Sequence, residues 1–250
     1  MFFSCCIVLV LLMANALAAD MPRVEDVIHN LDDLYRTSAS TGHVELIAKT
    51  ETQTRHLKMR VWSKGKDKSL IIIDEPAREA GTATLKVGNN LWNYLPKISR
   101  TMRIPPSMML SSWMGTDFTN DDLVKDTSYE RDFDTRIVGR SSDPNGWKGV
   151  MEVKPGVVGR VVGRWQKIEW VVNEEGTLPV VAHYYDRKGR LARTMWFTDV
   201  KMMGGRKIPT RMLLETVDQP GHLTELRYLD MKFDVKLPDS LFSLSQLESQ

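Results

Sequence analysis

Cysteine is almost absent from this sequence, and its two copies lie together near the start. Cys5 and Cys6 both fall within the first 18 residues. Removal of those residues would leave a chain without any thiol, which excludes a disulfide framework, a cysteine-based metal site and a thiol nucleophile. The stability of residues 19–250 must then come from a packed core, and their number is sufficient for one sizeable domain.

A hydrophobic run long enough to span a bilayer is also lacking. The apolar stretch from Cys5 to Ala19 has 15 residues, whereas a spanning helix needs about 20. It contains the unbroken run Ile7–Met13 and ends at Ala16-Leu17-Ala18, a small-x-small motif typical of signal-peptide cleavage. No Lys or Arg precedes the run, which is atypical. We predict a cleaved signal peptide over residues 1–18 and therefore export; the alternative is an uncleaved anchor.

Neither an excess charge of one sign nor a catalytic motif is present. The chain has 34 Lys and Arg against 32 Asp and Glu, a net charge of +2, which is a mixed surface and not a nucleic-acid footprint. The motifs G-x-S-x-G, H-E-x-x-H, G-x-G-x-x-G and the P-loop are missing, and the five histidines are not at metal-ligand spacing. We predict no enzyme activity, no nucleic-acid partner, no metal and no cofactor.

Hydrophobic periodicity predicts one helix followed by many strands. Apolar residues at positions 24, 27, 28, 31 and 34 have helical spacing, so an amphipathic helix is expected over Val24–Leu34. Gly42 ends this region, and the period then becomes two, as in His56–Trp62. Gly65-Lys66-Asp67 predicts a turn into the apolar run Leu70–Ile73.

The same alternation predicts strands through most of the remaining chain. Turns rich in Gly, Asn, Asp and Pro separate them. The expected strands are Thr82–Val87, Leu91–Leu95, Tyr129–Gly139, Trp147–Lys154, Gln166–Val172, Val180–Asp186, Leu191–Val200, Ile208–Val217 and His222–Phe233. Ten or so strands behind one helix indicate a mainly β protein, with a single antiparallel sheet curled toward a barrel. No linker or repeat divides residues 19–250, so we predict one domain.

One segment interrupts the strand pattern. Pro105-Pro106 ends a strand, and Ser107–Gly115 follows with the pairs Met109/Trp113 and Leu110/Met114 at i,i+4. Proline suits a first helical turn and Gly115 suits a C-terminal cap. The sequence therefore predicts a short apolar helix inserted between strands.

Methionine and aromatic residues are concentrated around this predicted helix. Methionine adapts to ligands of varied shape because its torsions are soft and its sulfur is polarizable. Such a surface suits flexible acyl chains, although the same residues could fill an ordinary core. The candidate cavity or lid residues are Trp92, Tyr94, Met102, Met108, Met109, Leu110, Trp113 and Met114.

Four aspartates follow in the segment T-D-F-T-N-D-D-L-V-K-D: Asp117, Asp121, Asp122 and Asp126. A calcium loop would also need a glycine and a terminal glutamate, which are absent. We expect instead that Thr119 or Asn120 caps a helix whose first turn holds Asp121 and Asp122, where negative charge is favourable.

Three stretches resemble a known family. Residues 91–123, LWNYLPKISRTMRIPPSMMLSSWMGTDFTNDDL, resemble the central motif of the LolA-like family of outer-membrane lipoprotein-sorting proteins. GGRKIPT at 204–210 and the segment Leu237–Leu247 resemble that family's later motifs. The resemblance spans most of residues 19–250 in the expected order.

The resemblance implies a LolA-like fold, an unclosed half barrel with a few covering helices. It also implies a monomeric periplasmic lipid or lipoprotein carrier, which takes acyl chains from an inner-membrane exporter toward an outer-membrane acceptor. Val24–Leu34 and Ser107–Gly115 would form the movable cover, and Arg100 or Arg103 would hold a lid carbonyl or meet a cargo head group. Two alternatives remain: an accessory subunit of an exporter without its own cargo, and a lipid-modifying enzyme.

Overall fold

The computed structural model describes residues 20–35, 37–124, 128–157 and 165–249. The predicted signal peptide and both cysteines lie outside these ranges, so the cleavage near Ala18 stays a prediction. Within the described ranges, no helix has the length and apolar character needed to cross a membrane.

One antiparallel sheet forms the body of the protein. Its thirteen strands follow the order β6-β5-β4-β3-β2-β1-β13-β12-β11-β10-β9-β8-β7. The strands are β1 (Ala39–Lys49), β2 (Thr54–Lys64), β3 (Lys68–Glu75), β4 (Ala83–Val87), β5 (Asn90–Leu95), β6 (Arg100–Arg103), β7 (Phe133–Ser142), β8 (Asn145–Val153), β9 (Trp165–Val172), β10 (Pro179–Asp186), β11 (Leu191–Met203), β12 (Arg206–Thr216) and β13 (Leu223–Phe233).

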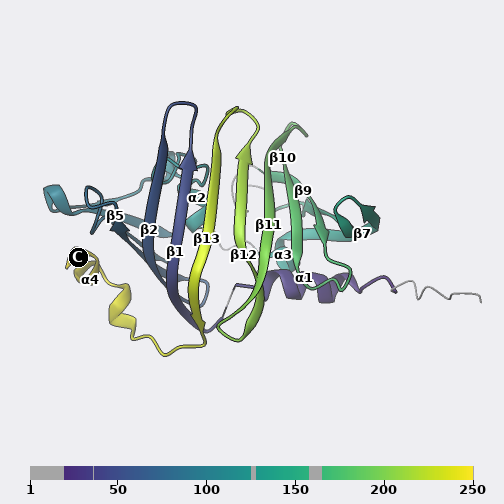
Figure 1. Ribbon diagram of the computed structural model, residues 1–250, viewed down its shortest axis with the longest axis horizontal. Coiled ribbons are helices and arrows are strands. Elements are labelled where there is room, and N and C mark those ends of the chain that lie inside the picture. Colours follow the sequence, from purple (N-terminus) through teal and green to yellow (C-terminus); the bar gives the residue numbers. More distant parts are fainter. Residues whose placement is uncertain (1–19, 36, 125–127, 158–164, 250) are drawn as a thin grey trace, which may run out of the picture.

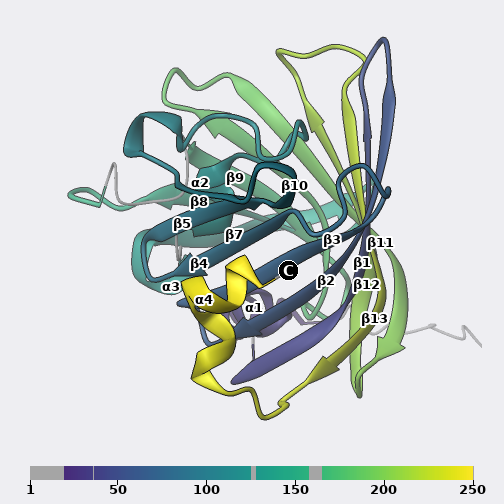
Figure 2. The same cartoon turned by 90° about the vertical axis from the view of Figure 1, so that its left-hand side faces the viewer.

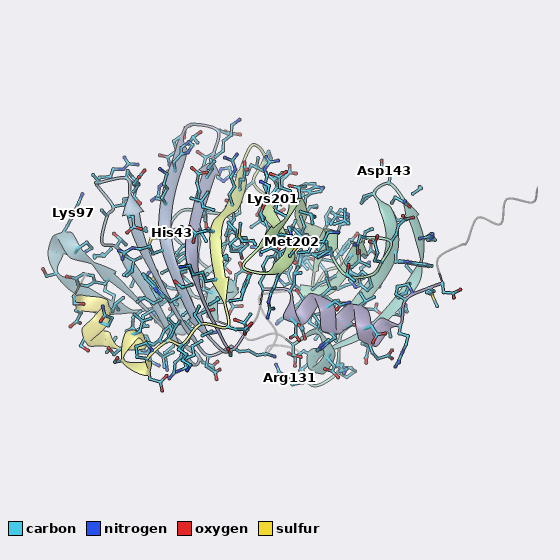
Figure 3. The ribbon with its side chains drawn as sticks, turned by 60° about the horizontal axis from the view of Figure 1, so that its bottom comes forward. His43, Lys97, Arg131, Asp143, Lys201 and Met202 are labelled. Carbon is cyan, nitrogen blue, oxygen red and sulfur yellow. The ribbon has the colours of Figure 1, made fainter. Side chains whose placement is uncertain are left out.

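The sheet consists of two meanders joined at its centre. β1 to β6 form one meander and β7 to β13 the other, and pairing of β1 with β13 makes the sheet continuous (Figure 1). β6 and β7 are the two edges. The hairpins next to these edges carry Lys97 and Asp143, which lie at opposite ends of the molecule (Figure 3). The predicted mainly β, curled and unclosed sheet is confirmed.

Alternating side chains give the sheet a concave face with an apolar lining. On β2, Leu57 and Met59 are buried while the intervening Lys58 is exposed. β3 is apolar on both faces: Ile73 packs inside with Met59, whereas Leu70 packs outside against the C-terminal segment. A strand that is covered on both sides needs consecutive apolar residues, which explains the run Leu70–Ile73.

Short helices cover the sheet on both sides. They are α1 (Val24–Asp33), η1 (Pro96–Ile98), η2 (Pro106–Met108), α2 (Asn120–Val124), α3 (Tyr129–Asp132), η3 (Asp239–Phe242) and α4 (Leu244–Glu248). The helix expected over Val24–Leu34 is confirmed as α1. Figure 2 shows η3 and α4 across the outer face of β3 and β4, where Phe242 and Leu247 are buried.

The structure corrects several expected elements. The helix expected over Ser107–Gly115 is wrong: only the 3₁₀ turn Pro106–Met108 forms, followed by turns. The strand expected from Tyr129 begins instead at Phe133, because Tyr129–Asp132 form α3 with Ser128 accepting a capping hydrogen bond from the Arg131 N–H. β1 and β6 were not predicted, since the small and polar residues of β1 weaken its alternation.

Candidate functional site

Two neighbouring pockets lie on the concave face. The larger has a volume of about 350 Å³ and the smaller about 230 Å³. Tyr35, Phe118 and Leu123 line both and so separate them. The larger pocket lies against β8 to β12, and its lining includes Met151, Trp165, Ile168, Trp170, Val181, Ala182, Tyr184, Arg193, Met195, Phe197 and Met212. The smaller lies against β1, β2, β3 and β13, and its lining includes Val44, Leu46, Met59, Val61, Ile71, Trp113, Leu226 and Tyr228.

α1 covers part of the larger pocket. Its C-terminal end contributes Leu31, and Leu34 and Tyr35 follow it into the lining. The helix is fixed at two points: the Asn30 side-chain amide donates to the Gly176 carbonyl at 3.3 Å, and the Asp32 carboxylate accepts from the Tyr129 N–H at 3.4 Å. These bonds join α1 to the β9–β10 turn and to α3.

Residues 104–124, which we name the crossing segment, follow β6, cross the concave face and end with α2. Trp113 is buried, and its indole N–H donates to the Thr84 hydroxyl of β4 at 3.2 Å. The Asp117 N–H donates to the Thr224 hydroxyl of β13 at 2.9 Å, and that hydroxyl donates to the Asp117 carboxylate at 2.7 Å. The segment is thus attached to strands of both meanders.

An arginine on β2 forms another attachment. The Arg55 guanidinium donates to the carbonyl of Met114 and is also paired with Glu79. Gly115 permits this approach, because a Cβ there would lie 2.7 Å from an Arg55 Nη1 atom, and its φ of +69° favours glycine. The glycine that was expected as a helix cap therefore serves a tight turn beside Arg55.

A buried ion pair attaches the start of α2 to β11. Arg193 donates to the Asp122 carboxylate at 3.1 Å and to the Asp117 carbonyl at 2.8 Å, with its side chain 6% exposed. The guanidinium also lies over the Trp165 ring at 4.9 Å. Asp122 in turn accepts from the Thr119 N–H at 2.7 Å, and the Thr119 hydroxyl accepts from the Asp122 N–H at 3.2 Å. The predicted capping by Thr119 is confirmed, and the pairing with Arg193 adds to it.

Four tyrosines line the pockets: Tyr35, Tyr129, Tyr184 and Tyr228. Tyr35 stacks on Tyr228 with ring centroids 5.3 Å apart and donates its hydroxyl to the Pro209 carbonyl at 2.8 Å. Burial raises the pKa of Tyr228 to about 12, and it raises the pKa of Tyr184 well above the usual range. Tyr129 hydrogen-bonds to Tyr184. Burial likewise raises the pKa of Tyr35, so the hydroxyls of Tyr35, Tyr184 and Tyr228 stay protonated at physiological pH.

The predicted cavity and lid residues are distributed over several environments. Trp113 lines the smaller pocket, and Met114 packs in the same cluster. Tyr94 and Trp92 pack instead with the C-terminal segment in a separate cluster. The others lie near the strand ends: Met109 packs by Leu91 and Ile104, Met102 is half-buried on β6, and Met108 and Leu110 are exposed.

The arginines that hold the crossing segment are Arg55 and Arg193. Arg100 is exposed, and Arg103 donates to Asn90 of its own neighbouring strand. Sequence analysis missed Arg193. A signal did exist: Arg193 shares a face of β11 with the apolar residues Met195 and Phe197. A charged residue on an otherwise apolar strand face requires a buried partner.

The acidic cluster shows no metal-binding arrangement in the part of the chain that the structure describes, where no three His, Cys, Asp or Glu residues converge. Asp117 and Asp122 are engaged in the contacts above, Asp121 is buried, and Asp126 lies outside the described residues.

Comparison with known proteins identifies the family. A family model described as that of an uncharacterized protein matches residues 65–249. The chain belongs to this family. It is similar to the crystal structure of a DUF1329 family protein from Desulfovibrio piger, with a TM-score of 0.77 and 25% identity over 89% of this chain and 96% of that one. No curated protein matches the sequence.

Two further structures agree. A LolA superfamily protein from Nitrosomonas europaea has a TM-score of 0.73 and 25% identity over 90% of this chain and 100% of that one. An outer membrane lipoprotein-sorting protein domain from Vibrio parahaemolyticus has a TM-score of 0.73 and 21% identity over 90% and 98%. The resemblance of this chain to the LolA-like family is thereby confirmed, and its fold is LolA-like.

Proposed function

We propose that this protein is a periplasmic carrier that shelters the acyl chains of a lipid or lipoprotein and catalyses no reaction. The observation that carries the proposal is the pair of apolar pockets on the concave face, together about as large as typical ligand sites. Each buried methylene contributes about 0.8 kcal/mol, so even a chain of moderate length would bind favourably.

The attachments of the cover support this role. The crossing segment contains little regular structure; the apolar side chains of Trp113, Met114, Phe118 and Leu123 pack on the sheet, and the polar contacts of Arg55, Asp117 and Arg193 complete its attachment. A segment without its own repeating backbone hydrogen bonds opens at lower free-energy cost than the centre of a sheet. The crossing segment and α1 would therefore move to admit and release cargo while the sheet keeps its shape.

The test is to fill the larger pocket. Ala182 lines it and is buried on β10, so Ala182→Phe would occupy space that cargo needs. We expect at least a tenfold loss of affinity for a fluorescent acyl probe in protein that stays folded, with a stability loss of about 1–3 kcal/mol, the usual cost of overpacking. The control is Val138→Phe, which adds volume at an exposed position of β7. Unchanged probe binding in folded Ala182→Phe would contradict the carrier function, as would mature protein purified from periplasm without lipid detectable by native mass spectrometry.

The second candidate is an accessory subunit of an inner-membrane exporter without cargo of its own. The exposed side chains of Met108 and Leu110 in the crossing segment favour it, since they offer apolar contact to another protein. Met108→Ser combined with Leu110→Ser separates the two functions: a carrier keeps its affinity for the probe, whereas an accessory subunit loses its partner.

A further inference from the structure

The two pockets share one apolar floor. Met212 of β12 lines the larger pocket and Leu226 of β13 lines the smaller, and these two residues are directly opposite each other in the ladder between the strands. Opposite residues of an antiparallel pair have Cβ atoms about 4.5–5.5 Å apart, so no strand lies between the pockets. The concave face is therefore a single trough, and its division must come from the segments that cover it.

Side chains of the cover form this division, which we name the partition. It consists of Tyr35, which follows α1, and of Phe118 and Leu123 in the crossing segment; these are the three described residues that line both pockets. All three are half-buried, so part of their surface is accessible. A molecule in contact with the partition would therefore adjoin both pockets.

The partition is held in place from both sides. The Tyr35 ring stacks on Tyr228 with centroids 5.3 Å apart, and its hydroxyl donates to the Pro209 carbonyl at 2.8 Å. The Phe118 carbonyl accepts from the Trp113 N–H at 2.7 Å. A single chain that lay across both pockets would have to displace these side chains from their contacts, whereas two chains could lie on either side of them.

Neither pocket offers an unmatched charge to a head group. In the described lining of the larger pocket, the charged residues are Arg193 and Asp122, which are paired at 3.1 Å. The described lining of the smaller pocket holds no charged residue. Transfer of a charged head group into such surroundings is costly. The head group therefore stays outside, and the pockets are left to apolar chains.

We propose that the cargo is a lipid with two acyl chains on one head group, with one chain in each pocket and the linkage between them at the partition. The proposal rests on the carrier function and specifies the chemical class of its cargo. A second chain that is joined to the first meets its pocket at an effective concentration in the millimolar range, which raises the overall affinity by a factor of about 10²–10⁴. A single-chain lipid leaves the apolar wall of one pocket in contact with water.

The experiment compares three lipids with the same phosphocholine head group, each below its critical micelle concentration: the dioctanoyl lipid, its octanoyl lyso form and the hexadecanoyl lyso form. The dioctanoyl and hexadecanoyl lipids have the same number of chain carbons, in two chains or in one. Displacement of a fluorescent acyl probe measures their affinities. We expect the dioctanoyl lipid to bind at least a hundredfold more tightly than the octanoyl form and at least tenfold more tightly than the hexadecanoyl form.

The decisive variant is Ser69→Phe, which fills part of the smaller pocket. Ser69 is half-buried on β3 and lines that pocket. The affinity for the dioctanoyl lipid should fall at least tenfold, because its second chain loses its place. The octanoyl form should keep its affinity through the larger pocket, which also shows that the variant is folded. Ser142→Phe, at an exposed position of β7, is the matched control and should change neither affinity.

Phe118→Ala gives a second test, because it removes a large part of the partition. One long chain could then extend through both pockets, so the affinity for the hexadecanoyl form should rise relative to that for the dioctanoyl lipid. This ratio is measured within one variant and is insensitive to the fraction of folded protein.

The outcomes separate this inference from the carrier function. If Ser69→Phe lowers the dioctanoyl affinity no more than Ser142→Phe does, both chains lie in the larger pocket, and the two-chain proposal fails while the carrier function stands. A hexadecanoyl form that binds the wild-type protein as tightly as the dioctanoyl lipid would overturn the proposal in favour of one long chain. If none of the three lipids displaces the probe, the carrier function itself fails.

Discussion

Single residues on the concave face determine how closely large side chains approach the sheet. Trp170 lies flat over Gly149 of β8, where a Cβ atom would stand 2.0 Å from the ring. Glycine in a strand interior is intrinsically unfavourable, and its presence is explained where another group must come close. The shape of the larger pocket thus depends on a residue that does not itself line it.

Gly149→Ala should therefore displace the Trp170 ring. We expect a loss of about 1–3 kcal/mol in the free energy of unfolding, as for overpacking in a core, together with a changed near-ultraviolet spectrum. Denaturant titration measures the first. Lys148→Ala, next to it but on the exposed face, should change stability by less than about 0.5 kcal/mol. Equal effects of the two variants would show that the ring is free to move.

At the scale of elements, the crossing segment takes its conformation from long-range contacts. Its own hydrogen bonds include Trp113 N–H to the Phe118 carbonyl at 2.7 Å and Asp121 N–H to the Met109 carbonyl at 2.8 Å. The first of these bonds flanks an isolated antiparallel bridge between Ser112 and Thr119, and the pattern does not continue along the segment. Its position is set by side chains from β2, β4, β11 and β13.

Removing the buried cation should release this segment selectively. Arg193→Met leaves Asp122 without its ion-pair partner, and breaking such a pair costs about 3–5 kcal/mol. We expect the amides of Trp113 and Asp121 to lose hydrogen-exchange protection by a larger factor than those in the centre of β13. Uniform loss of protection over the whole chain would mean that Arg193 stabilises the sheet and not the crossing segment.

The C-terminal segment is held by charges that respond to acid. Lys64 and Lys68 donate to the Asp239 carboxylate at 2.9 and 3.0 Å, which lowers the pKa of that group to about 2. The ionised carboxylate therefore favours the attached segment above its ordinary pKa of about 3.9, and the contribution is lost as pH falls through 2.

We expect hydrogen exchange in the segment 239–248 to accelerate between pH 4 and pH 2, after correction for intrinsic rates. In Asp239→Asn this acceleration should be absent. A carboxyl titration of Asp239 with a midpoint near 3.9 would contradict the contact with the two lysines.

At the scale of the whole molecule, the two meanders depend on one shared ladder. β1 pairs with β13 from Ser40↔Phe233 to Lys49↔Leu223. Leu46 lies in this ladder, is fully buried and lines the smaller pocket. Damage at this position should therefore weaken both meanders together.

Leu46→Ala should lower the free energy of unfolding by about 2–5 kcal/mol, the usual range for such a truncation. Far-ultraviolet circular dichroism and tryptophan fluorescence should report one coincident transition, because tryptophans occur in both meanders. Two separate transitions would show that each meander folds independently.

The sequence by itself determined the strand-rich architecture. Alternation and glycine-rich turns depend on neighbouring residues only, so they revealed α1 and most of the strands. The prediction from sequence was wrong where long-range contacts overrule local preference. Residues 107–115 have helical spacing, yet the Trp113 indole is bound by Thr84 and the Met114 carbonyl by Arg55, and both partners are distant in sequence.

Tertiary structure decided the candidate site. Arg193, Asp122 and Trp165 come from separate parts of the chain, and the contacts of Arg193 with the other two follow from strand order and register. The composition of residues 91–123 drew attention to methionines and aromatic residues. Of these, Trp113 lines a pocket, while Trp92 and Tyr94 pack under the C-terminal segment. The pattern of a strand specifies which residues share a face, but the curl of the sheet and its covering segments decide which faces enclose a cavity.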